Sequence, residues 1–535
     1  MAAKPAETSV SQPPDGFCRS DSRALSLHFT LASEDVAHCA HKLDRLSGGK
    51  ATHEQIRAVY LDTPDYAIAG LGLGFGIRRR SGTSKYGRWK RFVEPLSPAT
   101  PKTARHARAS CLRRASAIDV VAQAETQRWL WSFFCDGTAA EARLDRENFV
   151  VNGKTVVLGS LSLRCDAPNA AFLYFVTEIC EPDRLRLSAE SNLARAYRLC
   201  GGQSALYVAA FAPPLDADMD AGAAFRAIAT ACFDQFLLNE ALIRATGDRE
   251  AVHQCRVALR RLSACLRFFS GFVGGSDYET LRADLKTLGT YLRDARDLDV
   301  MIADVITPKL ATDPPYGADA LMRAIEAQRK TAYAELVATL CAPSSAALFL
   351  RFALWLQAGA WTGFTDPKKS VERQHEPIAK YAREKFEKLH AKFVARCSEL
   401  GEMDKDDRHR TRIHAKNLRY DAEFFTSLAD SRSARKQMLA FIRAVKSLQT
   451  VLGDWNDILM ARQFLSGFGQ TTGTESEPKT NAKKTAASKA TNSPVTAANA
   501  LAQSIENISE AEFGEKTTKA CQAFGKLKPF WTQLG

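Results

Sequence analysis

One pattern of basic residues, followed by a phenylalanine pair, occurs twice in this chain. Each residue of the second copy lies 156 positions after its counterpart in the first. The matched residues are His253, Arg256, Arg260 and Phe268–Phe269 in the first copy, and His409, Arg412, Lys416 and Phe424–Phe425 in the second. Steps of three and four residues place the histidine and the cations on one face of a helix. The repeat therefore predicts two related helices, each with a basic stripe, in a duplicated fold around a polyanion.

A second pair of segments extends this duplication. LGTYLRDARDLDVM at 288–301 matches LQTVLGDWNDILMA at 448–461, and Lys286 stands before the first as Lys446 stands before the second. Because both motifs recur in the same order, we expect two similar helical bundles. Arg293 of the first copy is replaced by Gly453, so the two halves need not contribute equally. Arg296, Asp297 and Asp299, with Asp457 in the other repeat, are expected to form ion pairs that hold the bundles together.

Length and charge narrow the classes of protein. A chain of 535 residues predicts two or three domains. The net charge of +13 favours anionic partners such as nucleic acid, an anionic membrane surface or phosphate-rich small molecules. Thirteen cysteines without a Cys-x-x-Cys pair predict thiols in a reducing cytosol. No run of eighteen apolar residues and no apolar leader occur, so we expect a cytoplasmic protein without a membrane span.

The local patterns predict an α+β chain of two domains. Residues 1–22 are rich in proline and serine and are expected to form a disordered tail. From 23 to 213, short strand-like runs alternate with turns, including the hairpin VVNGKTVVL and the run FLYFVTEIC. Helices are expected at 33–46 and 187–200. This domain should be a closed or strongly curved antiparallel sheet.

The remainder, 219–535, shows long helical periodicities, among them 371–400 and 497–531, and is expected to be all-α. It follows a linker at 213–220. Residues 470–498 are rich in threonine, alanine and lysine and almost lack large apolar side chains, which predicts a disordered insert between two helices.

The motifs of the helical part resemble those of the CHAD family, the conserved-histidine α-helical domain. The segments that carry the resemblance are VHQCRVALRRLSACLRFF, LRDARDLDV, HRTRIHAKNLRYDAEFF and LGDWNDI. The resemblance covers about 219–535 and implies two pseudo-symmetric four-helix bundles with a basic central cavity that binds inorganic polyphosphate. Carried over residue by residue, the implied lining is His253, Arg256, Arg260, Lys286, Arg293, His409, Arg412, Lys416, Arg419 and Lys446.

Elementary chemistry agrees with this interpretation. Arginine forks bind phosphate oxygens bidentately, and lysine adds a point charge. A histidine beside a polyanion has its charged form favoured, so binding should strengthen in mild acid. The alternative is that the stripes are solvated helix faces paired with acids.

The first domain carries a weaker resemblance to the CYTH family of triphosphate tunnel proteins. Its basis is Tyr60-Leu-Asp-Thr-Pro64 followed by Gly76-Ile-Arg-Arg-Arg80. The family implies an eight-stranded β-tunnel in which basic residues grip a triphosphate and glutamates hold divalent metals. The predicted phosphate grip here is Arg78, Arg80, Lys90 and Arg143, with Arg146 as a possible addition.

The chain departs from the CYTH signature where the metal should bind. The family opens with Glu-x-Glu-x-Lys, and the aligned positions here are Ala24, Ser26 and His28. Glu178 remains as a possible metal ligand, but Cys180 stands where a second acid is expected. One glutamate cannot supply the several oxygens that Mg²⁺ requires. We therefore predict a degenerate tunnel, with Mg²⁺ or Mn²⁺ as cofactor only if it is active.

The sequence thus predicts a protein that binds inorganic polyphosphate, associated with polyphosphate granules, rather than an enzyme. One alternative is a metal-dependent triphosphatase that hydrolyses inorganic triphosphate in the tunnel. Another is a nucleic-acid-binding module, which is disfavoured because the helices lack the basic surface with interspersed aromatics that single-strand binders use.

Overall fold

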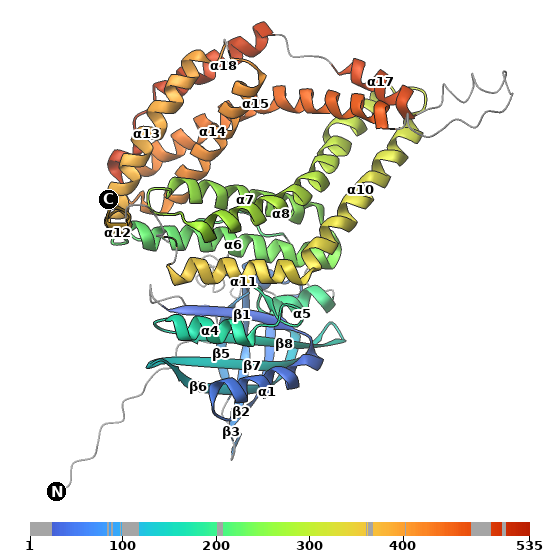
Figure 1. The fold of residues 1–535 in the computed structure, drawn as a ribbon. Coiled ribbons are helices and arrows are strands. Elements are labelled where there is room, and N and C mark those ends of the chain that lie inside the picture. The colour runs from blue at the N-terminus through green and yellow to red at the C-terminus, as the bar shows by residue number, and fades with distance from the viewer. Residues whose placement is uncertain are drawn as a thin grey trace, which may run out of the picture. The chain divides into compact units, whose positions relative to one another are not determined.

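The computed structural model describes residues 24–82, 85–86, 89–96, 98, 117–200, 207–213, 215–359, 361, 367–401, 403–471, 494–505 and 510–534. The predicted tail at 1–22 and most of the predicted insert at 470–498 lie outside these residues. The chain forms two compact units (Figure 1). The first, which we call the β unit, comprises 1–208 and 342–358; the second, the helical unit, comprises 209–341 and 359–535. The α+β architecture predicted from the sequence is confirmed.

The β unit is built on one antiparallel sheet. Its strands are β1 (Leu25–Leu31), β2 (Thr52–Asp62), β3 (Leu73–Gly82), β4 (Lys85–Tyr86), β5 (Lys90–Pro95), β6 (Asp119–Cys135), β7 (Thr138–Val151), β8 (Lys154–Cys165) and β9 (Arg186–Leu187). Their order is β4-β3-β2-β6-β7-β8-β1-β9, with β5 also paired to β3. Within the described part of the chain no pairing joins the two edges, so a closed tunnel stays a prediction. The predicted β7–β8 hairpin is confirmed, with positive φ at Asn152 and Gly153 as a type I′ turn requires.

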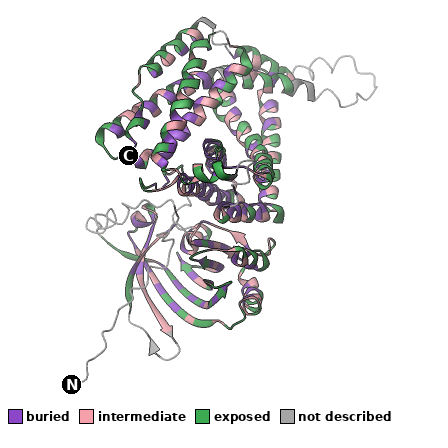
Figure 2. Cartoon of the chain, turned by 60° about the vertical axis from the view of Figure 1, so that its left-hand side comes forward, coloured by how far each residue is buried: buried purple, intermediate pink, exposed green. Residues whose placement is uncertain are grey.

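The two faces of this sheet carry different helices. Helices α1 (Val36–Ser47) and α4 (Ala170–Ile179) cover the outer face, where Trp131 Nε1 donates to Asp44 Oδ1 at 2.8 Å. Helix α5 (Asn192–Cys200) lies on the inner face and contacts both β8, through Arg195 and the Gly159 carbonyl, and β3, through Leu193 and Gly74. Three strands separate β3 from β8 in the order, so the sheet must curve around α5 (Figure 2). The inner face is therefore concave.

The segment FLYFVTEIC is a helix rather than the predicted strand. It forms α4, whose N-cap Asn169 accepts a hydrogen bond from the Phe172 backbone amide. Its buried residues are Phe172, Phe175, Val176 and Ile179, a spacing of three and four that matches a helix. The aromatic and β-branched composition suggested a strand, but the cap and the periodicity decide the local structure. The β unit also contains the 3-10 turn Ser33–Asp35, α2 (Ala67–Gly70) and α11 (Pro343–Ala358).

The helical unit contains two sets of four helices, each joined in a ring of contacts. The first set is α6 (Ala221–Thr246), α7 (Arg249–Phe268), α8 (Ser276–Val300) and α10 (Ala318–Cys341); the second is α13 (Ile378–Glu399), α14 (Lys405–Phe424), α15 (Arg432–Thr471) and α18 (Glu510–Gly525). A π-helical turn (Met301–Ile306), α9 (Thr307–Thr312), α12 (Pro367–Gln374), α17 (Pro494–Ser504) and two 3-10 turns (Thr426–Leu428 and Phe530–Gln533) complete the unit.

Helices α7 and α14 correspond in detail. Both have 20 residues, and their N-caps, Asp248 and Asp404, each accept a hydrogen bond from the amide three residues later. These caps are themselves 156 positions apart. Helices α8 and α15 likewise bury Leu288 and Leu448 at matching positions. The repeated helix pair supports the predicted duplication, while two complete duplicated bundles stay a prediction.

Two helical predictions were too long. The predicted helix 371–400 is interrupted before Pro377, which cannot donate a backbone hydrogen bond, and the predicted helix 497–531 is divided into α17 and α18. The ends of the predicted insert, 470–471 and 494–498, are helical. Among the described residues no single helix is long and apolar enough to cross a membrane; only α10 and α11 taken together, as a bent pair, meet that criterion.

Candidate functional site

Five basic residues gather where α7 faces α8, and we call them the α7–α8 cluster. They are His253, Arg256, Arg260, Arg293 and Arg296. The four arginines influence the pKa of Arg256, of His253 or of both, which places the five residues within electrostatic range of one another. The acid nearest to Arg256 is Asp297, whose Oδ1 lies 3.5 Å from Arg256 Nη2. The sequence assigned four of these residues to a binding site but gave Arg296 a structural role.

Arg256 shows how crowded this cluster is. Burial lowers the pKa of its guanidinium to about 10. Three neighbouring guanidinium groups, Arg260, Arg293 and Arg296, shift the pKa in the same direction, and only Asp297 opposes them. Burial is the largest cause of this shift, and the neighbouring guanidinium groups add to it. The cluster thus has an unbalanced positive charge that an anion would relieve.

His253 shares this environment. Burial lowers the pKa of its imidazole, and Arg296 is the strongest of the cations that lower it further. In the part of the chain that the structure describes, neither Arg260 nor Arg296 has a carboxylate within ion-pair distance. Arg293 pairs only with the adjacent Asp294, at 3.2 Å and with both side chains about half exposed. Such an exposed pair contributes little and leaves the guanidinium available to a ligand.

The corresponding helices α14 and α15 differ from α7 and α8 in two of the predicted binding positions. Gly453 stands where the first copy has Arg293, and a Cβ there would lie 3.6 Å from Arg412 Nη2. The Arg412 guanidinium therefore lies against a bare stretch of helix. Arg419 donates to Glu423 Oε1 at 2.6 Å and to Gln449 Oε1 at 2.9 Å, so its fork is already occupied.

The other predicted residues lie on the expected helices. His409 and Lys416 are on α14 and make further interactions there, while Lys286 on α8 and Lys446 on α15 are exposed. Asp299 confirms its predicted structural role, because its buried carboxylate accepts from Arg329 Nε at 2.7 Å and from the Tyr333 hydroxyl at 2.5 Å. The side chain of Asp457 lies outside the described residues.

Comparison with known families identifies this unit. Residues 227–466 match the family model of the CHAD domain. The chain contains a CHAD domain. Among solved structures it is similar to the CHAD domain of the plant Ricinus communis, with 24% sequence identity over 60% of this chain and 98% of that one, and a TM-score of 0.47. No curated protein matches the chain.

A second solved structure is similar over a smaller part of the chain. It is a putative adenylyl cyclase from Hippeastrum, described as having a dominant triphosphatase activity. The identity is 16% over 33% of this chain and 95% of that one, and the TM-score is 0.21. The CYTH resemblance of the β unit, outside the CHAD domain, remains a prediction.

The inner face of the sheet brings together the four cations predicted to grip phosphate. Arg78 is paired with Lys90 across β3 and β5, and paired residues share a face. Following the pairing from Arg78 through Ala58 and Ala124 leads to Phe149 on β7. Arg80 and Arg143 lie an even number of residues from Arg78 and Phe149, so both share this face. Arg146 is on the opposite face, and its suggested part in the grip was wrong.

These cations meet carboxylates within the unit. Asp145 accepts two hydrogen bonds from the Arg128 fork, at 2.8 and 2.9 Å, and lies 3.4 Å from Arg143 Nε. Both Asp145 and Arg128 are buried. Arg80 Nη1 lies 3.9 Å from Glu54 Oε2. The sequence analysis missed Glu54 on β2, Arg128 on β6 and Asp145 on β7. Because side chains alternate between the two faces along each strand, the positions of these three residues could have indicated that they share the inner face.

His28, the residue that the sequence aligns with the lysine of the CYTH signature, also lies on this face. Its Nδ1 lies 3.1 Å from Ser162 Oγ, which also accepts a hydrogen bond from Arg143. Burial lowers the pKa of His28 to about 4, and the positive charge of Arg143 adds to the shift. The imidazole is therefore neutral at pH 7. A neutral ring gives a phosphate no counter-charge.

Glu178 does not lie on this face. It is exposed on α4, on the outer side of the sheet, because its segment is a helix. The prediction of Glu178 as a tunnel metal ligand is therefore wrong. Within the described ranges, no three His, Cys, Asp or Glu side chains converge as a metal site would require. Glu147, which does lie on the inner face, has its pKa raised by burial and accepts hydrogen bonds from Asn192 and Thr126.

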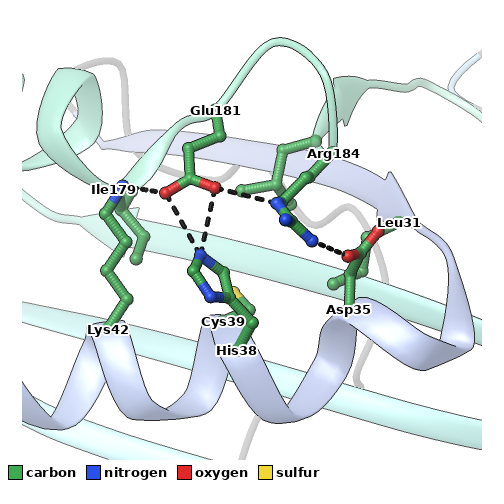
Figure 3. Close-up of a pocket in the computed structure, with 9 residues that line it drawn as sticks. Leu31, Asp35, His38, Cys39, Lys42, Ile179, Glu181 and Arg184 are labelled. Carbon is green, nitrogen blue, oxygen red and sulfur yellow. Dashed lines mark hydrogen bonds and ion pairs between the residues drawn. The ribbon is translucent and has the colours of Figure 1, made fainter.

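A small hollow between α1 and the segment after α4 is closed by ion pairs (Figure 3). Glu181 pairs with His38, Lys42 and Arg184, and Arg184 also pairs with Asp35. The hollow measures about 10 Å³, which is room for no more than one water molecule. We interpret this network as a structural link.

Proposed function

We propose that this protein binds inorganic polyphosphate through the CHAD domain and associates with polyphosphate granules. The observation that carries the proposal is the α7–α8 cluster, in which four arginines and a histidine meet few carboxylates. Arg256 lies 3.5 Å from Asp297 and Arg293 pairs with the exposed Asp294, while Arg260 and Arg296 have no carboxylate within ion-pair distance among the described residues. Such an excess of positive charge is unfavourable unless a ligand supplies the counter-charge. Arginine forks suit phosphate oxygens in particular, because they bind them bidentately.

The helical spacing suits an extended ligand. His253, Arg256 and Arg260 follow one another along about 10 Å of α7, at 1.5 Å per residue. Arg293 and Arg296 add cations from α8. A polyphosphate carries negative charge on every phosphate and can follow both helices, whereas a compact anion meets only part of the cluster. The second helix pair, α14 and α15, would extend this surface with Arg412, Lys416 and Lys446 if the two bundles face one cavity.

The alternative function is a metal-dependent triphosphatase in the β unit, with Mg²⁺ or Mn²⁺ as cofactor. The inner face favours it in part, because Arg78, Arg80, Lys90 and Arg143 share that face. Against it, Asp145 and Glu54 already neutralise some of this charge. The test is phosphate release from inorganic tripolyphosphate with either metal. Turnover that is lost in a variant with R78A, R80A and K90A would support this alternative.

The proposal is tested by binding of long-chain polyphosphate to the full chain across a series of salt concentrations, with excess single-stranded nucleic acid as competitor. We expect binding that weakens steeply with salt and survives the competitor. A variant with R256A, R260A, R412A and K416A should lose at least about 100-fold in affinity, at 1.5–3 kcal/mol for each charged hydrogen-bonding group removed.

The matched control is R282A, an exposed arginine on α8 that pairs with Glu279, which should leave affinity unchanged. Displacement by the nucleic acid would favour the nucleic-acid alternative. Full affinity in the four-residue variant would show that the basic stripes are structural.

A further inference from the structure

Aromatic side chains join the ends of three helices in the CHAD-containing unit. The ring centroid of Phe268 on α7 lies 5.3 Å from that of Phe386 on α13 and 5.3 Å from that of Phe425, which caps α14. Phe386 and Phe425 are 5.5 Å apart. The Tyr381 hydroxyl on α13 also donates to the Phe268 carbonyl at 3.2 Å. These contacts fix the end of α7, the first half of α13 and the end of α14 close together.

Five further basic residues surround this junction, and we call them the α13 cluster. They are Arg267 on α7, Lys385, Lys388 and Lys392 on α13, and His414 on α14. Spacings of three and four residues place the three lysines on one face of α13. None of the five belongs to the residues that the sequence assigned to polyphosphate binding.

The cluster is short of negative charge. Burial lowers the pKa of Lys385, and the charges of Lys388 and Arg267 lower it further. Burial likewise lowers the pKa of His414, with contributions from Lys392 and Arg267. Among the residues described by the structure, Lys388 and Lys392 have no carboxylate within ion-pair distance.

The acids near this cluster are largely committed. Asp421 is buried, and its Oδ2 lies 3.7 Å from Arg267 Nη2. Glu384 pairs with Arg373, and Asp407 pairs with Arg396 and Arg410. Asp421 is thus the buried carboxylate at this cluster, and the two basic groups that act on it are Arg267 and Lys385.

The fold by itself does not require this basic face. Helix α6 contacts α7 in the first ring as α13 contacts α14 in the second. Nineteen of the 26 residues of α6 are buried, against five of the 22 residues of α13. A solvated helix face is the simplest explanation for exposed lysines, but such faces usually alternate the sign of charge. Cations repeated at three and four positions repel one another, which favours a face that receives an anion.

The α13 cluster is separate from the face of α14 that carries Arg412 and Lys416. His414 follows Arg412 by two residues, which turns it about 200° around the helix at 3.6 residues per turn. On α7, however, Arg267 follows Arg260 by seven residues, which is two turns along the same face, or about 10 Å. Arg267 therefore links the α7 stripe to the α13 cluster.

We propose that the α13 cluster is a second phosphate-chain site, reached along α7 through Arg267 and occupied by long-chain polyphosphate. This inference rests on the proposed function. A short oligophosphate bound at the α7–α8 cluster would end before α13, whereas a long chain continues across Arg267 to the three lysines. The CHAD domain would thereby select for chain length, with each additional phosphate contact adding to the affinity of long chains alone.

The test compares short-chain and long-chain polyphosphate on the full-length protein and on a K388A/K392A variant. Both lysines are exposed, so their removal should leave the fold intact. We expect the affinity for long chains to fall about tenfold and the salt slope of long-chain binding to decrease by about two. Short-chain affinity should stay unchanged. The matched control is R323A/K330A, which removes two exposed cations from α10 and should change neither affinity.

Two outcomes would overturn the inference while leaving the proposed function in place. One is unchanged long-chain affinity in K388A/K392A. The other is an equal loss for short and long chains. A wild-type protein that binds neither chain would instead overturn the proposed function itself.

Discussion

The inner face of the sheet and the α7–α8 cluster hold similar arginines in opposite electrostatic conditions. On the inner face, Arg128 and Asp145 form a buried bidentate pair at 2.8 and 2.9 Å. In the α7–α8 cluster, Arg256 is 3.5 Å from Asp297, whose side chain is 51% exposed, and three other arginines lower its pKa. A count of arginines would rank the two regions alike. Their counter-charges differ: among the described residues, the inner face holds a buried carboxylate between Arg128 and Arg143, whereas the α7–α8 cluster holds only half-exposed carboxylates.

The comparison also explains why the CYTH resemblance predicts less than the CHAD resemblance. A buried arginine requires a partner, because removing a charge from water is costly. On the inner face that partner is a residue of the same chain. The phosphate grip implied by Arg78, Arg80, Lys90 and Arg143 is thus in place as a face, but part of its charge is used internally.

Removal of the internal partner should have the largest effect on stability. D145A leaves Arg128 buried without its carboxylate and should destabilise the β unit by about 3–5 kcal/mol, as is typical for one partner of a buried pair. Thermal unfolding of the full chain measures this. If the inner face can still accept phosphate, inorganic tripolyphosphate should raise the melting temperature of D145A more than that of the wild type. An unchanged melting temperature in D145A would show that the pair does not neutralise this face.

Asp421 offers the reverse case, a buried acid inside a basic region. Burial raises its pKa to about 7 from an ordinary value of 3.8. The folded protein holds the Asp421 proton more tightly than the unfolded chain does. Protonation of Asp421 therefore stabilises the folded protein fully below about pH 4, and this stabilisation is lost as the pH rises to about 7. D421N should therefore stabilise the helical unit at pH 8 by about 4 kcal/mol, at 1.4 kcal/mol per pKa unit.

The gain in unfolding free energy of D421N over the wild type should shrink towards zero near pH 4. At that pH the Asp421 carboxyl becomes protonated in the unfolded chain as well as in the folded protein. Denaturant unfolding at the two pH values measures the difference. Equal gains at pH 4 and pH 8 would contradict the raised pKa.

The buried His28 makes the stability of the β unit depend on pH. The pKa of its imidazole is lowered from 6.5 to about 4, so the unfolded chain binds a proton that the folded chain refuses between these pH values. The β unit should lose up to about 3 kcal/mol of stability as the pH falls from 6.5 to 4. Hydrogen exchange in β7 and β8 follows this loss. H28N should make it smaller, and an identical pH profile in H28N would exclude His28 as the cause.

We expect the smallest change in stability and affinity from a substitution at Gly453, where the second helix pair differs from the first, which has Arg293. G453A places a methyl group 3.6 Å from Arg412 Nη2, an ordinary contact, and replaces a helical glycine. The change should stabilise the helical unit by about 1 kcal/mol. Polyphosphate affinity should stay within about twofold, which is less than 1 kcal/mol. A large loss of affinity would show that Arg412 needs the bare helix to reach the ligand.

The sequence predicted the features that depend on local spacing. The 156-residue repeat indicated α7 and α14 with their basic faces, and the Asn-Gly turn indicated the β7–β8 hairpin. It misassigned FLYFVTEIC because bulky and β-branched residues occur in both strands and buried helices, and the cap at Asn169 was overlooked. It also missed Arg128 and Asp145, since a pair between two strands depends on register. Arg296 and the α13 lysines were missed because helix–helix contacts bring them together.

The central claim is that the polyanion binds at the helical cations and that the inner face of the sheet contributes little. Calorimetric titration of long-chain polyphosphate into two full-length variants tests it directly: R256A/R260A/R293A in the helical unit and R78A/R80A/K90A in the β unit, each of which removes three positive charges. We predict a loss of at least about 100-fold in the first and a change of less than about threefold in the second. A larger loss in the second variant would place the ligand on the sheet and contradict the account.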